Sequence, residues 1–259
     1  MIPILDSLAH PTLSGNWGRQ PQVCTFRQLV TSIEDANFAG ACAIGMAGVE
    51  GYSHEEFMVE CRQYEKLIPI AGYDPATSAA HDELSRLKTL GYRGVKLHPR
   101  YSHVTRSLDK LAKVFQAAGQ LDLIVFYCTY LHGPLASYPK RDPLYDLVGL
   151  LEQAPDTKVI LVHGGDVNLL RYAELVRFNE NLLLDLSLTL MKYAGSSLDL
   201  DLKFLFSKFD RRICIGTDYP EYNHADVRLR FEQLSRELTE EKCENIAFRN
   251  LATLLRWST

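Results

Sequence analysis

Eight short apolar runs recur along the chain, each rich in Val, Ile, Leu or aromatic residues. They lie at residues 2–6, 41–46, 67–73, 92–98, 121–128, 157–163, 180–187 and 211–218. Near-continuous apolar runs of this kind are typical of parallel strands that are buried on both faces. The pattern therefore predicts eight strands.

Segments with helical periodicity lie between these runs, because their apolar positions return every three or four residues. Thr25 and Gln28 form a capping-box pattern at the start of one segment, and Asp142 precedes Pro143 at the start of another. Gly91 ends a third segment, in a position where helices often close. We expect helices over residues 25–37, 53–67, 81–91, 142–153, 168–179, 200–209, 225–238 and 240–257.

The alternation of strands and helices predicts the fold class. Eight strands that alternate with helices in a chain of 259 residues fit a (β/α)8 TIM barrel. The competing architecture is an open, doubly wound sheet, but no GxGxxG pattern follows the first run. The glycines of "GMAGVEG" are spaced GxxGxxG, which we interpret as a loop. No linker rich in Pro, Gly or Ser divides the chain, so we expect a single barrel domain over residues 1–259.

Composition narrows the class of partner. The net charge is -4 and the isoelectric point is about 6.1, which gives no electrostatic case for nucleic acid or an anionic membrane. No apolar run is long enough to span a bilayer, and the start "MIPILDS" lacks the features of a signal peptide. The six cysteines are scattered without a CxxC pattern, which favours free thiols in the cytoplasm. We therefore expect a cytoplasmic protein with a small-molecule substrate, and a homo-oligomer is compatible with this composition.

Polar residues stand at the carboxyl ends of six of the eight runs, where a barrel enzyme carries its chemistry. Because side chains alternate along a strand, we expect these residues to point into the barrel. The side chains at the intervening positions, such as Ile160 and Val162, are then expected to face the helices. A barrel interior is normally aliphatic, so packing alone does not explain this set: His10, Lys96 with His98, Cys128, His163, Asp185 with Ser187, and Asp218.

Each of these residues, taken alone, also fits a structural role. His163 suits a core histidine, Cys128 a buried thiol and Lys96 an ion-pair partner. Asp185 and Ser187 suit a strand-end cap or a support for neighbouring groups. Further polar residues lie on predicted loops, and we expect them at the surface: Trp17, Glu50, His54, Asp74, His103, His132, Glu221 and His224.

The motifs at the strand ends resemble a known family. "LDSLAH", "GVKLHP", "VILVHGG", "LDLS", "IGTDYP" and "NIAFRNLATLL" occur in the order and spacing of the amidohydrolase-related family of the amidohydrolase superfamily. The resemblance covers essentially the whole chain. It implies a metal-dependent (β/α)8 barrel, whose relatives hydrolyse esters, lactones and amides or decarboxylate aromatic and related acids.

The ligand set that the resemblance implies is only partly present. Asp6 and the second histidine of the family's Asp-x-His-x-His pattern are kept, but Leu8 replaces the first histidine. A thiol replaces the histidine that ends the fifth strand. Zinc accepts Cys, His and Asp ligands, so one expected outcome is a divergent zinc site made by His10, Cys128, His163 and Asp218.

The leading hypothesis is a metal-dependent hydrolase of a small carboxylic ester, lactone or amide. Asp218 is the general base, His163 binds the metal or polarises the carbonyl, and Lys96, His98 and Arg100 contact the substrate. Three alternatives stay open at this point. They are a decarboxylase with the same site, a metal-free enzyme in which His163 and Asp218 form an acid–base pair, and a non-catalytic small-molecule binding protein.

Overall fold

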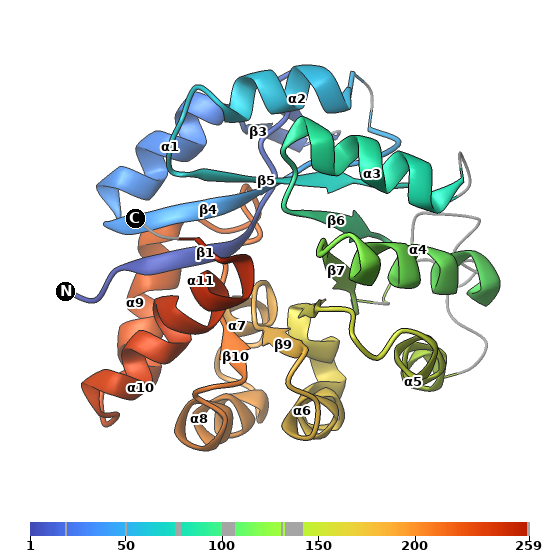
Figure 1. Cartoon of the computed structure of the whole chain (residues 1–259). Coiled ribbons are helices and arrows are strands. Elements are labelled where there is room, and N and C mark those ends of the chain that lie inside the picture. The colour runs from blue at the N-terminus through green and yellow to red at the C-terminus, as the bar shows by residue number, and fades with distance from the viewer. Residues whose placement is uncertain are drawn as a thin grey trace.

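Eight parallel strands form one sheet whose spatial order follows the chain (Figure 1). The computed structural model describes residues 1–18, 20–49, 51–75, 79–99, 107–130, 132 and 142–257. The strands of the sheet are β1 (Ile4–Ala9), β4 (Phe38–Ile44), β5 (Leu67–Gly72), β6 (Gly94–Leu97), β7 (Ile124–Cys128), β8 (Val159–Val162), β9 (Leu182–Asp185) and β10 (Ile213–Cys214).

The sheet closes where β1 meets the chain that follows β10. The N–H of Ser7 donates to the carbonyl of Ile215 at 3.1 Å, and Ala9 forms a parallel bridge with Tyr219. A parallel sheet that closes on itself, with helices around it, is a TIM barrel. The predicted fold class is confirmed.

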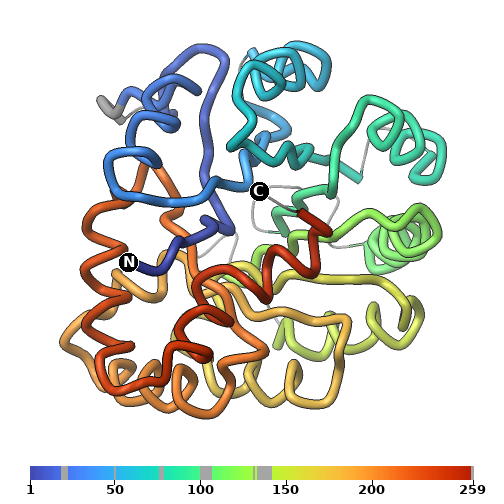
Figure 2. Tube along the Cα trace, turned by 60° about the vertical axis from the view of Figure 1, so that its left-hand side comes forward, coloured from blue at the N-terminus to red at the C-terminus, as the bar shows by residue number. Residues whose placement is uncertain are grey.

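Helices surround the sheet on its outer side (Figure 1, Figure 2). The longer ones are α1 (Phe26–Asp35), α2 (His54–Cys61), α3 (Ala80–Leu90), α4 (Leu108–Gln120), α5 (Pro143–Gln153), α6 (Leu169–Arg177), α8 (Leu198–Lys208) and α9 (His224–Ser235). Shorter ones are α7 (Thr189–Lys192), α10 (Glu240–Glu244) and α11 (Asn250–Leu255), with a 3₁₀ segment at His163–Asn168 and a π-helical turn at Asn245–Arg249.

The helix ends follow the local chemistry of the sequence. The hydroxyl of Thr25 accepts from the N–H of Gln28, whose side chain accepts from the N–H of Thr25 in return, so the predicted capping box is present. Asp142 caps α5, which begins at Pro143, and Gly91 ends α3 with a φ of 103°. These positions confirm the predicted starts of α1 and α5 and the predicted end of α3, whereas α2 ends at Cys61, before the predicted residue 67.

Helix α4, a short hairpin and the short helix α7 were absent from the sequence prediction. Helix α4 buries an amphipathic face that includes Leu111 and Phe115, but its N-cap Ser107 makes no capping hydrogen bond. A two-stranded antiparallel hairpin, β2 (Asn16–Trp17) with β3 (Gln20–Val23), follows β1. A strand of two residues is too short to produce a periodic signal, so the hairpin could not be read from the pattern.

The strand side chains divide between two apolar clusters. One joins residues such as Ala43 and Leu161 to the helices. The other combines residues from strands on every side of the barrel, so it fills the interior: Leu5, Leu8, Cys42, Ile44, Ile68, Ile70, Ile124, Phe126, Ile160, Val162, Leu183 and Cys214. The prediction that Ile160 and Val162 face the helices is therefore wrong, because Val159 and Leu161 take that role.

The C-terminal helix closes the amino-terminal end of the barrel. Leu251 and Leu255 of α11 belong to the interior cluster, and Trp257 packs against it. A Cβ at Gly40, near the start of β4, would lie 3.2 Å from the Trp257 ring, so the indole covers this strand closely. Figures 1 and 2 show this dark red segment near β1.

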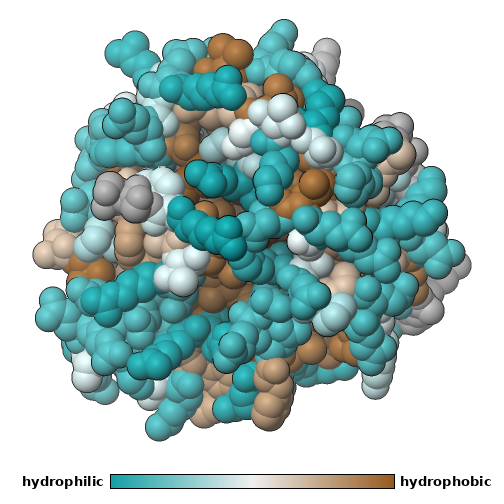
Figure 3. Space-filling view, in the orientation of Figure 1, coloured by the Kyte–Doolittle hydropathy of each residue, from teal (hydrophilic) through white to brown (hydrophobic). Residues whose placement is uncertain are grey.

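Hydrophilic residues cover most of the face in Figure 3, and apolar residues appear there as separate patches. Among the described ranges, no helix is both long and apolar enough to cross a membrane.

We expect Leu251→Ala to lower the free energy of unfolding by about 2–5 kcal/mol, because Leu251 is 1% exposed under the barrel. The matched control is Leu200→Ala on α8, where the leucine is 70% exposed and the cost should stay within about 0.5 kcal/mol. Urea unfolding of both variants checks the prediction. Equal losses would contradict the role of α11 as the closing element.

Candidate active site

Two predicted site residues stand at sharp turns after their strands. His163 follows β8 with a φ of 68°, and Asp218 follows β10 with a φ of 53°. A left-handed conformation is strained for a residue with a side chain, and such strain collects at functional sites. The turn also explains why strand alternation gave the wrong side-chain orientations on β8. Val162 faces the interior, and the turn redirects the side chain of the next residue, His163.

His10 and Asp218 meet at the seam where the barrel closes. His10 is 2% exposed, and its Nε2 lies 3.5 Å from Oδ1 of Asp218. Its Nδ1 donates to the carbonyl of Ile44 at 3.2 Å, which fixes the plane of the ring. Trp17 of the hairpin stacks on this ring with centroids 5.1 Å apart and 23° between the planes. His10 is thus a firmly positioned residue of the carboxyl end of the barrel.

The loop after β9 holds the ring of His163. Its Nδ1 lies 3.2 Å from the carbonyl oxygen of Ser187 and 3.2 Å from the hydroxyl oxygen of the same residue. A carbonyl oxygen can only accept, so Nδ1 carries the hydrogen when the ring is neutral. The neutral ring therefore has its free lone pair on Nε2.

Asp185 holds this arrangement in place through hydrogen bonds. Its Oδ1 accepts from the hydroxyl of Ser7 at 2.5 Å and from the N–H of Ser187 at 3.0 Å. Its Oδ2 accepts from the N–H of His163 at 3.2 Å and from the hydroxyl of Ser187. Burial raises the pKa of Asp185, and these four donors oppose the rise. Asp185 and Ser187 therefore have the supporting role that the sequence left open for them.

A buried cation lies beside these groups. Lys96 is 2% exposed, so its ammonium is withdrawn from water. In the sheet it is in register with Phe126, whose ring belongs to the interior cluster, so its side chain also points into the barrel. Its charge acts electrostatically on both His163 and Asp218.

Burial and neighbouring charges set the protonation states. Burial lowers the pKa of His163 to about 4, while the Asp218 carboxylate opposes this shift and Lys96 adds to it. Burial alone would raise the pKa of Asp218, but His163, His10 and Lys96 lower it to about 2. At neutral pH, Asp218 is therefore a carboxylate and His163 a neutral imidazole.

The sequence patterns did not identify a further polar group at the carboxyl end of the barrel. Lys192 donates to the hydroxyl of Tyr130 and lies 4.2 Å from the centroid of its ring. Tyr130 meets His163 edge to face with centroids 6.0 Å apart, and Nε2 of His132 lies 2.7 Å from Oδ2 of Asp166. Lys192 belongs to the short α7 and carries no motif. The only available signal was Asp166, which directly follows "VHGG".

The structure brings together four of the predicted site residues: His10, Lys96, His163 and Asp218. Cys128 is fully buried at the end of β7, and its Sγ donates to the carbonyl of Tyr130 at 3.9 Å. It is in register with Val162, so it too faces the interior. His98 is partly buried after β6, and Arg100 lies outside the described residues.

These residues do not fit a divalent metal ion. Within the described ranges, no three or more His, Cys, Asp or Glu side chains are grouped so that they could hold one. Leu8, which replaces a ligand histidine, is buried in the interior apolar cluster. Lys96 already supplies positive charge near Asp218, and a second cation beside it would be repelled. The zinc predicted at His10, Cys128, His163 and Asp218 therefore finds no site in this part of the chain.

Comparison with known proteins gives a family match and several similar folds. A family model described as Amidohydrolase matches residues 12–256. No curated protein matches the sequence. An uncharacterised TIM-barrel protein from Bordetella bronchiseptica has a TM-score of 0.80 and 17% identity, with 98% of this chain and 99% of that chain covered.

Two other similar structures have named activities. The probable 2-pyrone-4,6-dicarboxylic acid hydrolase of Acinetobacter baumannii, crystallised with citric acid, has a TM-score of 0.72 and 18% identity, covering 99% of this chain and 100% of that one. The 5-carboxyvanillate decarboxylase of Sphingomonas paucimobilis has a TM-score of 0.77 and 13% identity, with both chains fully covered. At this identity the likeness shows a shared fold.

We expect the imidazole of His163 to titrate near pH 4, as measured by NMR and assigned with His163→Asn. Asp218→Asn should lower this pKa further, because it removes a negative charge. Lys96→Met should raise it, because it removes a positive charge. Shifts in the same direction in both variants would contradict the arrangement of charges.

Proposed function

Because the chain belongs to the amidohydrolase family, we propose that it hydrolyses a small carboxylic ester, lactone or amide without a metal ion. The chain is an enzyme of the amidohydrolase type. One observation carries the specific proposal. An ionised Asp218 lies beside the neutral His163 and the buried ammonium of Lys96, at the carboxyl end of the barrel.

Asp218 and His163 activate the attacking water. The carboxylate of Asp218 accepts one hydrogen of this water, and Nε2 of His163 accepts the other. Attack of the water oxygen on the carbonyl carbon transfers a proton to Asp218, which then returns it to the leaving group. A carboxyl group with a pKa of about 2 is a weak base, so this transfer depends on stabilisation of the negative charge that forms on the substrate.

Lys96 supplies that stabilisation. Its ammonium is held in the barrel interior, where water cannot screen it, and a developing oxyanion there gains a strong interaction. Burial also keeps the cation in place before the reaction, so little reorganisation is needed. In this proposal, Lys96 takes the role that a metal ion has in a metal-dependent hydrolase.

His10 and the residues near Tyr130 bind the rest of the substrate. Trp17 and Tyr130 offer aromatic surfaces, which suit a planar or unsaturated acyl group. Lys192 offers a positive charge near Tyr130 that suits a second polar or anionic group of the substrate. His98 and Arg100 remain proposed substrate contacts after β6.

We expect Asp218→Asn to lower kcat/KM by about 10²–10⁴-fold, since the amide cannot accept the proton. The matched control is Glu221→Gln, three residues along and exposed, which should leave kcat/KM unchanged.

In the wild type, kcat/KM should rise with pH through about 4 as His163 loses its proton, and should then be level to pH 8. Circular dichroism at each pH confirms that the protein stays folded.

The assay uses panels of esters, lactones, amides and aromatic carboxylic acids, with CO₂ release measured for the acids. Full activity of the Asp218→Asn variant on every accepted substrate would refute the role of Asp218. Release of CO₂ without hydrolysis would establish decarboxylation instead. Ligand-induced thermal stabilisation without any turnover would indicate a binding protein.

A further inference from the structure

A second group of reactive side chains lies outside the barrel interior, between α1 and α9. Oγ of Ser32 lies 2.8 Å from Nδ1 of His224. Nε2 of the same ring lies 3.1 Å from Oδ2 of Asp6. Serine, imidazole and carboxylate are thus aligned in the order that activates a serine for nucleophilic attack.

The imidazole lies between its two partners, within 3.1 Å of Asp6 but without hydrogen-bond geometry at Nε2. We expected His224 at the surface, but it is fully buried as the first residue of α9. Phe38 meets the ring edge to face at 4.8 Å. Nε2 faces a carboxylate and therefore carries the hydrogen in the neutral ring, so Nδ1 presents its lone pair to the hydroxyl of Ser32.

The carboxylate is equally well fixed. Oδ1 of Asp6 accepts from the N–H of Leu8 at 2.9 Å and from the N–H of Thr217 at 2.9 Å. Oδ2 accepts from the hydroxyl of Thr217 at 2.6 Å. Asp6 is completely buried, so its negative charge can stabilise an imidazolium that forms at His224.

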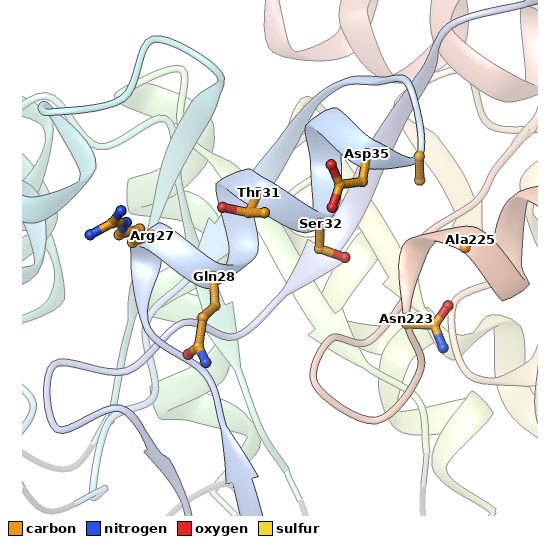
Figure 4. Close-up of a pocket in the computed structure, with 8 residues that line it drawn as sticks. Arg27, Gln28, Thr31, Ser32, Asp35, Asn223 and Ala225 are labelled. Atoms are coloured by element: carbon orange, nitrogen blue, oxygen red, sulfur yellow. The ribbon is translucent and has the colours of Figure 1, made fainter.

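The hydroxyl of Ser32 is accessible from outside. Ser32 lines a groove of about 430 Å³ between α1 and the start of α9, with Arg27, Gln28, Asn223 and Ala225 among its other lining residues. Figure 4 shows Ser32 on the side of α1 that faces Asn223 and Ala225. A groove of this volume can admit a small acyl ester.

The start of α9 supplies donors for the oxyanion. The first N–H groups of a helix have no acceptor within the helix, and its amino terminus favours negative charge. The side chain of Asn223 caps the N–H of Asp226 at 2.8 Å, and the carbonyl of Asn223 accepts from Val227. The N–H of Ala225, which lines the groove, has no acceptor within the helix, and we assign it to the oxyanion.

We propose that Ser32, His224 and Asp6 form a second, nucleophilic site that cleaves small acyl esters. Oγ of Ser32 attacks the ester carbonyl and gives its proton to Nδ1 of His224. The carbon–oxygen bond to the alcohol then breaks, and His224 protonates the departing alkoxide. Water hydrolyses the acyl-serine by the same route, with His224 taking and returning the proton, so ester and water yield acid and alcohol.

The test is covalent labelling of the full-length Asp218→Asn protein with a fluorophosphonate, because that background removes the base proposed for the barrel site. Peptide mass spectrometry should locate the adduct on Ser32. The Ser32→Ala change should abolish the adduct and the turnover of p-nitrophenyl acetate that remains. The matched control is Ser85→Ala, a half-buried serine on α3 outside this groove, which should keep both.

Replacing His224, the proposed base, shows whether Ser32 reacts because it is activated or only because its hydroxyl is exposed. His224→Gln should slow the labelling of Ser32 by about 10²–10⁴-fold, with folding checked by circular dichroism. If this variant does not fold, the comparison of Ser32→Ala with Ser85→Ala decides the matter. Absence of an adduct on Ser32, or identical turnover of p-nitrophenyl acetate with and without Ser32, would overturn the proposal and would leave the proposed role of Asp218 untouched.

Discussion

The buried carboxylate of Asp6 holds the barrel closed. It binds two backbone N–H groups and the hydroxyl of Thr217, and so ties β1 to the turn after β10. Gly216 in that turn is required by the close approach, since a Cβ there would lie 2.8 Å from Oδ1 of Asp6. The next residue after Thr217 is Asp218. The contact that completes the barrel therefore also places the proposed base.

The chemistry of the site follows from burying opposite charges together. An isolated buried ammonium or carboxylate would be strongly destabilising, but Lys96 and Asp218 compensate each other, and His163 is neutral at neutral pH. The same low-dielectric surroundings that make each charge costly alone make their action on a substrate strong. The left-handed turns at His163 and Asp218 direct both side chains to this place.

Much of this arrangement could be predicted from the sequence, for identifiable reasons. The alternation of apolar runs and helical segments reflects buried parallel strands, so it specified the barrel. The polar strand ends specified which residues meet, since carboxyl ends of parallel strands gather at one end. The alternation of side chains along β8 did not predict the orientation of His163, because the backbone turns at this residue and no longer has strand geometry.

Other features depend on contacts between distant parts of the chain. The burial of His224 depends on Ser32, 192 positions away in sequence, and on Phe38. The place of Lys192 near Tyr130 depends on how α7 packs, and no local pattern records it. The loss of metal ligands at Leu8 and Cys128 was visible in the sequence, but the cation proposed to replace the metal was recognisable only from the burial of Lys96 and its position beside Asp218.

The claim that Lys96 replaces a metal ion is tested most directly by metal analysis. Protein purified without added metal or chelator is measured by elemental mass spectrometry, and its activity on the accepted substrate is assayed before and after treatment with a chelator. We expect substoichiometric metal, activity that the chelator leaves unchanged, and loss of activity in Lys96→Met. About one zinc or manganese per chain, with activity that is lost on chelation and restored by the metal, would contradict this claim.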